Sequence, residues 1–186
     1  NWELASYVEM ATRTTAAHAA VEGHLDRLAQ AGLDLVIVSN APQECAVCRP
    51  WEGKVLSRSG VTGSVSAEDA LGVGTVTVDV AASVRTATAS GLFHPSCRHS
   101  LSAYIPGVTK APTNTADPIG DAARQRLRLL ERRLRKAKLQ ADTAMTPEAT
   151  ARAKARVRDL QSQIRDHVAS TPAKRQPNRE RIGVAR

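Results

Sequence analysis

Aromatic side chains are scarce in this chain of 186 residues, where two Trp, two Tyr and one Phe make up 3% of the sequence. Hydrophobic residues still account for 42%, so a core has to be built mainly from aliphatic side chains and alanine. No apolar run approaches the roughly 20 residues that cross a bilayer, and the N-terminal stretch lacks the profile of a signal peptide. We therefore expect neither membrane insertion nor export.

Cysteine is also sparse, because the chain has only three, which cannot pair off evenly as disulfides. Cys45 and Cys48 form a C-x2-C pair, and Cys97 lies in the cluster 94–99, His-Pro-Ser-Cys-Arg-His. This spacing is typical of metal ligands in a protein made in a reducing compartment. Three thiolates and two imidazoles are enough to close a tetrahedral Zn²⁺ site, so the sequence predicts zinc as a cofactor.

A structural zinc ion with four protein ligands is the interpretation that fits this thiolate-rich set best, and the alternatives are a catalytic zinc ion and a cluster that binds no metal. The predicted ligands are Cys45, Cys48, Cys97 and His99, with His94 as the alternative fourth ligand. Ligation by both Cys97 and His99 would require an extended segment with the two side chains on one face, which the start of a strand allows, whereas Pro95 stiffens the spacing between His94 and Cys97. The remaining histidine is either a hydrogen-bond partner of the ligands or a packed residue.

The chain contains no His-x-Glu sequence, which zinc-dependent nucleic-acid deaminases use as ligand and proton shuttle. That mechanism is excluded. Another enzyme remains as the alternative: a zinc-dependent nuclease or toxin-type enzyme with one open coordination position, in which Glu44 or Glu52 would act as general base. We expect the protein not to be an enzyme, and we expect no small-molecule substrate.

Charge is divided unevenly along the chain. Residues 1–109 carry 7 Lys and Arg against 10 Asp and Glu, whereas residues 110–186 carry 19 against 8. The segment between these parts is rich in Pro, Gly, Thr and Asn, as linkers are. We therefore predict a domain at 1–107, a linker at 108–120, a basic helical hairpin at 121–169 and a basic C-terminal tail at 170–186.

The front part has the pattern of an α+β domain with a long N-terminal helix and a small sheet. Apolar residues recur with helical spacing over 2–31, and Gly32 ends that helix. We expect strands at 33–38, 54–57 and 100–105 and a short helix at 78–89, and the pattern at 59–74 assigns no element. The first residue is Asn1, and helical periodicity starts at once, so we expect a longer polypeptide before it.

The back part predicts two amphipathic helices of about 22 residues, since apolar residues recur at three- and four-residue steps over 127–141 and again over 153–168. Thr146 is placed to cap the second helix, and Pro147 suits its first turn. The short break between the helices predicts an antiparallel hairpin. The tail after Ser170 has almost nothing to bury, so we expect it to be extended and ordered only if something holds it.

Several motifs together resemble a known family. They are Cys-x-x-Cys-Arg-Pro-Trp-Glu-Gly-Lys-Val-Leu-Ser at 45–57, Gly-Leu-Phe-His-Pro-Ser-Cys-Arg-His-Ser-Leu at 91–101 and Tyr-Ile-Pro-Gly at 104–107. The back part adds Arg-Gln-Arg at 124–126, Leu-Glu-Arg at 130–132, Thr-Pro-Glu at 146–148 and Arg-Glu-Arg-Ile-Gly at 179–183. Over nearly the whole chain, this set is similar to the phage minor capsid proteins related to the head morphogenesis protein F of phage Mu.

The resemblance implies a virion component, made in the host cytoplasm, that associates with the portal vertex and the capsid interior in head assembly or early DNA delivery. Expected partners are the portal protein, the major capsid protein and packaged double-stranded DNA. The basic part could bind DNA phosphates or an acidic protein surface. The alternative is that its cations form only a solvent-exposed outer face of the hairpin, without a binding partner. The candidate nucleic-acid or partner-binding residues are Arg124, Arg126, Arg128, Arg132, Arg133, Arg135, Lys136, Lys174, Arg175, Arg179 and Arg181.

Overall fold

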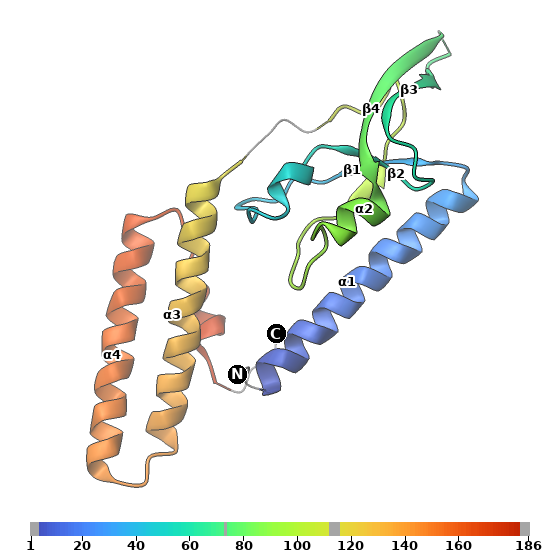
Figure 1. Ribbon diagram of the computed structural model, residues 1–186. Coiled ribbons are helices and arrows are strands. Elements are labelled where there is room, and N and C mark those ends of the chain that lie inside the picture. The colour runs from blue at the N-terminus through green and yellow to red at the C-terminus, as the bar shows by residue number, and fades with distance from the viewer. Residues whose placement is uncertain (1–3, 73, 112–115, 183–186) are drawn as a thin grey trace. The chain divides into compact units, whose positions relative to one another are not determined.

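The computed structural model describes residues 4–72, 74–111 and 116–182 (Figure 1). The chain forms two compact units, which we call unit 1, Asn1–Ala116, and unit 2, Asp117–Arg186. The division falls in the segment predicted as a linker, 108–120, of which residues 112–115 lie outside the described ranges. Trp2, at the start of the predicted first helix, and the last four residues of the predicted tail also lie outside them.

Unit 1 begins with the long helix α1, Leu4–Gln30, which confirms the predicted N-terminal helix over its described residues. The helix ends where Gly32 takes a φ of +71°, a conformation that costs glycine little. Two backbone bonds close this end: Gly32 N donates to Ala29 O at 3.0 Å, and Leu33 N donates to Leu28 O at 2.9 Å. The chain then turns directly into the sheet.

The sheet of unit 1 has five strands in the order β3-β4-β2-β1-β5. Its members are β1 Leu35–Val38, β2 Val55–Ser57, β3 Gly63–Glu68, β4 Thr75–Ser83 and β5 Leu101–Ala103. β1 pairs antiparallel with both β2 and β5, β2 pairs parallel with β4, and β4 pairs antiparallel with β3. The strands predicted around 33–38, 54–57 and 100–105 are therefore present, with shorter bounds.

The helix predicted at 78–89 is wrong in its first half. Residues up to Ser83 belong to β4, and only Val84–Ala89 form a helix, α2, capped by the Ser83 hydroxyl. Val76, Val78 and Val80 alternate with polar residues, and this period of two places their side chains on one face of a strand. The segment 59–74, left without an element, contributes β3, whose Gly63–Glu68 pairs with β4 along its whole length.

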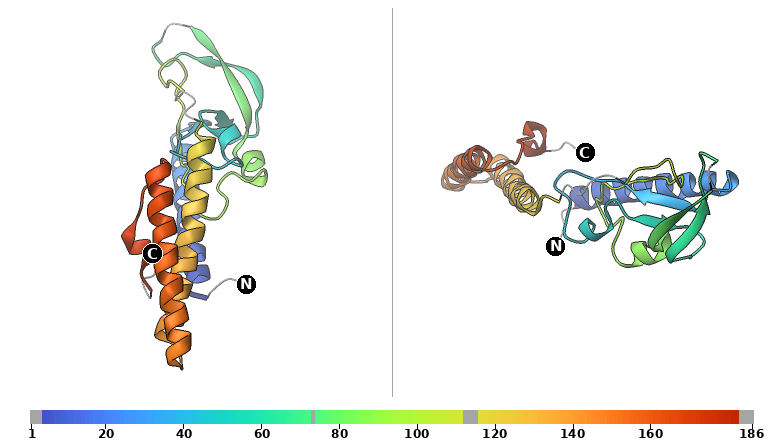
Figure 2. Two further views of the ribbon diagram at one scale, coloured as in Figure 1. Left: turned by 90° about the vertical axis from the view of Figure 1, so that its left-hand side faces the viewer. Right: turned by 90° about the horizontal axis from the view of Figure 1, so that it is seen from above.

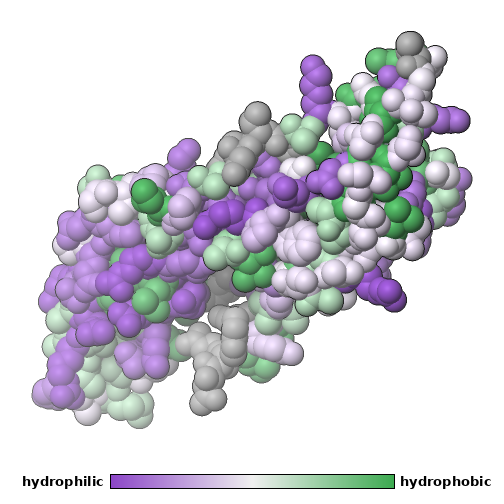
Figure 3. Space-filling model, turned by 45° about the horizontal axis from the view of Figure 1, so that its top comes forward, coloured by the Kyte–Doolittle hydropathy of each residue, from purple (hydrophilic) through white to green (hydrophobic). Residues whose placement is uncertain are grey.

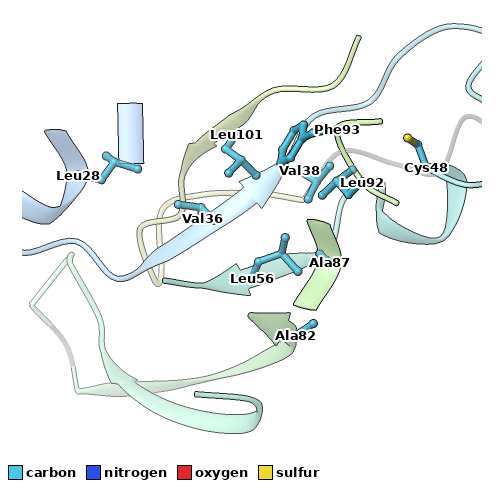
Figure 4. Close-up of a cluster of buried hydrophobic side chains, with 10 residues drawn as sticks. All are labelled: Leu28, Val36, Val38, Cys48, Leu56, Ala82, Ala87, Leu92, Phe93 and Leu101. Atoms are coloured by element: carbon cyan, nitrogen blue, oxygen red, sulfur yellow. The ribbon is translucent and has the colours of Figure 1, made fainter. Parts of the chain in front are cut away.

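A cluster of buried side chains joins α1, the sheet and α2, as Figure 4 shows. Val36 and Val38 from β1 and Leu56 from β2 are fully buried, and Leu28 packs there from α1. Cys48 is also fully buried, at one edge of the cluster. The buried residues of this cluster are aliphatic apart from Cys48 and Phe93, in line with the scarcity of aromatic residues in the sequence.

Unit 2 is an antiparallel helical hairpin made of α3, Pro118–Asp142, and α4, Pro147–Ser170. The two helices lie side by side in every view (Figure 2). Leu127, Leu130 and Leu134 from α3 pack with Leu160 and Ile164 from α4. The Thr146 hydroxyl accepts a hydrogen bond from Ala149 N at 3.2 Å, which confirms the predicted cap. Across the described ranges, every helix is too short or too polar to cross a bilayer.

The tail differs from the extended segment that the sequence predicted. Residues Pro177–Glu180 form a short 3-10 helix, η2, and both Ala173 and Glu180 are buried. α3 holds the tail, because Arg135 Nη1 donates to Arg179 O at 2.6 Å and Lys138 Nζ donates to Glu180 O at 2.8 Å. The buried Ala173 methyl group and the two bound carbonyl groups hold this polar segment against the hairpin.

Candidate metal centre

Two loops of unit 1 carry all the predicted zinc ligands. The first runs from the end of β1 to the 3-10 helix η1, Arg49–Trp51, and holds Cys45 and Cys48. The second runs from α2 to β5 and holds the cluster 94–99. Val38, the last residue of β1, pairs with Leu101, the first residue of β5. The pairing of these two strand ends is what brings loops about 50 residues apart in sequence to one place.

Local backbone bonds fold each loop tightly around its cysteine. Cys45 O accepts from both Cys48 N at 3.1 Å and Arg49 N at 3.0 Å, and Cys97 N donates to His94 O at 2.9 Å. Gly91 starts the second loop with a φ of +100°, and a Cβ atom there would lie 2.6 Å from Val47 Cγ1. Only glycine therefore fits at the point where the two loops touch.

The five donor side chains fall into two triplets that share Cys48. Cys45, Cys48 and His94 form one, and Cys48, Cys97 and His99 form the other, with the donor atoms of each triplet within 4.8 Å of one another. Cys48 Sγ lies 3.6 Å from Cys97 Sγ, and Cys97 Sγ lies 3.4 Å from His99 Nδ1. These two separations are close to the edges of a zinc tetrahedron, about 3.8 Å for S to S and about 3.5 Å for S to N, that follow from ordinary Zn–S and Zn–N bonds.

The two histidines differ in what their second ring nitrogen contacts. His99 Nε2 donates to Glu52 Oε1 at 2.7 Å, so Nδ1 is directed at Cys97. His94 Nδ1 lies 2.9 Å from Pro95 O, and its Nε2 lies 3.0 Å from Cys45 Sγ. His99 is buried and His94 is half-buried. A ligand histidine commonly donates its other ring N–H to a carboxylate or a carbonyl, and both histidines meet that condition.

Without a metal, the cysteine pKa values are driven apart. The hydrogen bond from the Cys48 thiol is the largest cause that lowers the pKa of Cys97, to about 3, and the His99 contact lowers it further. The same bond, together with burial, raises the pKa of Cys48. Burial alone would raise the pKa of Cys45, but hydrogen bonds from Cys48 N–H and His94 leave it below its usual value. Thiolate, the form that binds metal ions, is thus favoured at Cys45 and Cys97.

Contacts with these thiolates help to raise the pKa values of both imidazoles. Burial alone would lower the pKa of His99, yet its hydrogen bonds to Cys97 and Glu52 raise it above the usual value. His94 behaves in the same way, since burial opposes the effect but the bonds to Cys45 and to Pro95 O raise its pKa. The cluster therefore favours charge-paired thiolates and imidazolium groups when no cation is bound, and a cation would displace the imidazolium protons.

Sequence reasoning considered Glu52 as the general base of an enzymatic site, and the structure shows a different environment. Glu52 Oε1 also accepts from Ala41 N at 2.8 Å, so this oxygen joins the first loop to His99. Its other oxygen, Oε2, is buried and makes no hydrogen bond to the described residues. Glu44 is fully buried and forms an ion pair with Arg49. The sequence signal for a position of Glu52 beside the cysteines was that it follows the cysteine pair closely, within Trp-Glu-Gly.

The candidate nucleic-acid residues are not equivalent in the structure of unit 2. Arg124 pairs with Asp121, Arg128 with Glu131 and Arg175 with Glu180. Arg135 donates to the carbonyl oxygen of Arg179 within the tail contact. Arg179 is partly buried and donates from Nε to Gln176 Oε1 at 2.7 Å. The other six are exposed: Arg126, Arg132, Arg133, Lys136, Lys174 and Arg181. Hydrophilic side chains cover much of the face of the hairpin that Figure 3 shows.

Comparison with known proteins returns one family. The family model described as phage minor capsid protein 2 matches residues 1–169, which include both loops of the candidate metal centre and all of the hairpin except its last residue. No curated protein and no solved structure matches the chain.

Proposed function

We propose that this chain, which belongs to the phage minor capsid protein 2 family, is a component of the phage head. In this proposal a zinc ion stabilises its first domain, and its basic hairpin contacts neighbouring molecules. Membership of the family makes the protein a structural component of a phage capsid and places it in the virion. The single observation that carries this conclusion is the extent of the match, which covers both units.

The finer part of the proposal concerns position in the particle. Association with the portal vertex and the major capsid protein on the capsid interior, with a role in head assembly, follows from the resemblance of the motifs at 45–57 and 91–101. The basic charge of unit 2 supports an interior location, since it carries 18 Lys and Arg against 8 Asp and Glu and packaged DNA is the densest negative charge there.

The metal proposal is a structural zinc ion bound by Cys45, Cys48, Cys97 and His99, with His94 as the alternative fourth ligand. Cys48 and Cys97 already lie at a separation close to that of two thiolates on one zinc ion. Glu52 orients His99, which favours this histidine, and His94 then serves as a donor to the Cys45 sulfur. Closing the shell requires the Cys45 sulfur to approach Cys97 and His99 from its place in the other triplet.

The alternative, a zinc-dependent nuclease or toxin-type enzyme, needs a carboxylate that can reach a metal-bound water. Glu44 is engaged with Arg49, and Glu52 holds Ala41 N and His99 with one oxygen while the other is buried. Carboxylates engaged in this way support a structural role for the metal. Four protein ligands on bound zinc would agree with that role, whereas three ligands and a water, with nicking of DNA in the presence of zinc, would favour the enzyme.

The test of the main proposal is the composition of the particle. We expect peptides of the chain in purified, nuclease-treated phage particles, at a few copies per particle, and crosslinks from Lys and Arg of unit 2 to the portal or the major capsid protein. Empty heads assembled before packaging serve as the comparison, because a head-assembly protein is present in both. Absence of the chain from both kinds of particle would contradict the proposal.

A further inference from the structure

One side of α4 carries a line of cations that the predicted binding set does not contain. Lys154, Arg158 and Arg165 are spaced by four and seven residues, so at about 100° per residue they lie within an arc of about 40°. At about 1.5 Å per residue the line is about 16 Å long. We call these three residues the α4 basic stripe.

The stripe is exposed and its cations are unpaired. All three side chains are exposed, and none forms an ion pair or hydrogen bond within the described part of the chain. The helix positions within about 40° of the stripe are uncharged, namely Pro147, Thr150, Ala151, Gln161, Ser162, Val168 and Ala169. Three side chains that face water without a partner contribute nothing visible to the fold of the hairpin.

The carboxylates of α4 lie on a separate line. Glu148, Asp159 and Asp166 are spaced by eleven and seven residues, which places them within about 20° of one another and about 100° around the helix from the basic stripe. Arg152 and Arg156 fall on the side of this acidic line. Segregation of this kind produces a surface of one sign, whereas alternating charges would give a merely solvated face.

Elsewhere in unit 2 the fold uses several of the cations that the sequence suggested for binding. Arg124, Arg128 and Arg175 are in ion pairs, and Arg135 holds the tail. A cation that is already paired gains less from a phosphate, because the existing pair must first be broken. The unpaired stripe therefore offers phosphate contacts at lower cost than these residues do.

We propose that the α4 basic stripe binds the phosphate backbone of double-stranded DNA without sequence preference. The proposal deepens the DNA contact suggested above and rests on it. A duplex carries one negative charge per about 1.7 Å of axis, so a line of three cations about 16 Å long finds phosphates within reach along its whole length. The positions beside the stripe hold no aromatic side chain, and the one amide among them, Gln161, is only partly exposed, so we expect contacts to phosphates rather than to base edges.

The test compares two triple variants of the full chain that remove the same charge. Lys154→Gln, Arg158→Gln and Arg165→Gln remove the stripe, whereas Arg85→Gln, Arg152→Gln and Arg156→Gln remove three exposed cations that belong neither to the stripe nor to the predicted binding set. Glutamine has nearly the helix propensity of Lys and Arg, so both variants should keep the helical signal in circular dichroism. Binding to a labelled 30-base-pair duplex is measured by fluorescence anisotropy over a range of salt concentrations.

Loss of the stripe should lower the magnitude of the slope of log K against log salt by about 3, and the control triple by less than about 1. Equal changes in the two variants would contradict DNA binding by the α4 basic stripe, because they would show an effect of net charge alone. Failure of the unmodified chain to bind the duplex at about 50 mM salt would contradict it as well. Neither result affects the place of the protein in the virion, which depends on the composition of the particle.

Discussion

At the scale of single residues, Cys48 is the side chain on which the candidate metal centre depends most. It belongs to both donor triplets, it is fully buried, and it lies in the hydrophobic cluster of unit 1. A ligand in that position links the metal to the core directly. Around it, the strained conformations of the loops, such as the positive φ of Phe93 and Ser96, must be held by surrounding contacts, and the proposed metal ion would supply some of them.

Replacement of Cys48 tests whether metal and fold are coupled. Cys48→Ser should abolish stoichiometric zinc and destabilise unit 1 by several kcal/mol, because binding free energy of a structural zinc ion contributes directly to folding. The measurement is metal analysis together with thermal unfolding. Ser100→Ala, an exposed change next to His99, is the control and should retain zinc. Unchanged stability of the Cys48 variant would rule out stabilisation of unit 1 by a zinc ion bound to Cys48.

The choice between the two histidines is tested with cobalt in place of zinc. His99→Ala should remove the visible absorption typical of a tetrahedral cobalt–thiolate centre, because the predicted shell loses a ligand. His94→Ala should retain that absorption, since it removes only a donor to the Cys45 sulfur. The opposite pattern would assign the fourth position to His94.

Glu52 acts on the metal only through His99 in this proposal. Glu52→Gln keeps the size of the side chain but weakens the acceptor, so zinc affinity should fall about 10- to 100-fold while the zinc still binds with four protein ligands. Competition with a coloured chelator measures the affinity. A wild-type affinity in this variant would show that the carboxylate has no influence on the ligand.

At the scale of elements, the tail is bound to α3 and is stabilised by an ion pair of its own. Glu180 is buried and accepts two hydrogen bonds from Arg175, Nε to Oε1 at 2.6 Å and Nη2 to Oε2 at 2.8 Å. This pair raises the pKa of Arg175 above its usual value. The backbone carbonyl groups of residues 179 and 180 are bound by two side chains of α3. The tail is therefore part of the hairpin rather than an independent arm.

Breaking the ion pair between Arg175 and Glu180 should loosen the contact of the tail with α3. We expect Glu180→Ala to destabilise unit 2 by about 1 kcal/mol, a modest value because Arg175 is partly exposed and well screened by water. Hydrogen exchange of the backbone amides in residues 171–182 should rise at the same time. Arg181→Ala, an exposed neighbour, serves as the control. Equal protection in Glu180→Ala would show that the pair does not hold the tail.

At the scale of the whole molecule, the two units depend on different forces. Unit 1 has a small aliphatic core and a cluster of thiols and imidazoles, whereas unit 2 is held by the leucine-rich interface of α3 and α4. Only the first contains candidate metal ligands among the described residues. A small core of this kind benefits from an added cross-link more than a hairpin of 24- and 25-residue helices does.

Removal of the metal should therefore affect the units unequally. A strong chelator is expected to abolish the cooperative unfolding of unit 1 while most of the helical circular dichroism of unit 2 remains. Added zinc should restore the lost transition, and added magnesium should not, because thiolates bind zinc and not magnesium. Loss of both units on chelation, or of neither, would contradict this separation.

Sequence alone determined the features that depend on local spacing. The Cys-x-x-Cys pair and the cluster 94–99 predicted which side chains would meet, and the structure brings them within ligand distances in two triplets. The stripes of leucine and the Thr146 cap predicted the hairpin, because helical periodicity and capping involve residues three or four apart. The uneven charge of the two parts is likewise a property of composition.

The tertiary structure decided what depends on partners distant in the chain. β4 was taken for part of a helix because its strand form is stabilised by pairing with β3 and β2, which local propensity does not reveal. The same holds for Glu52, whose contact with His99 arises from the meeting of two loops, and for the tail, which is ordered by α3. Which cations remain unpaired was decided in the same way, since an ion pair requires two side chains to be brought together by the fold.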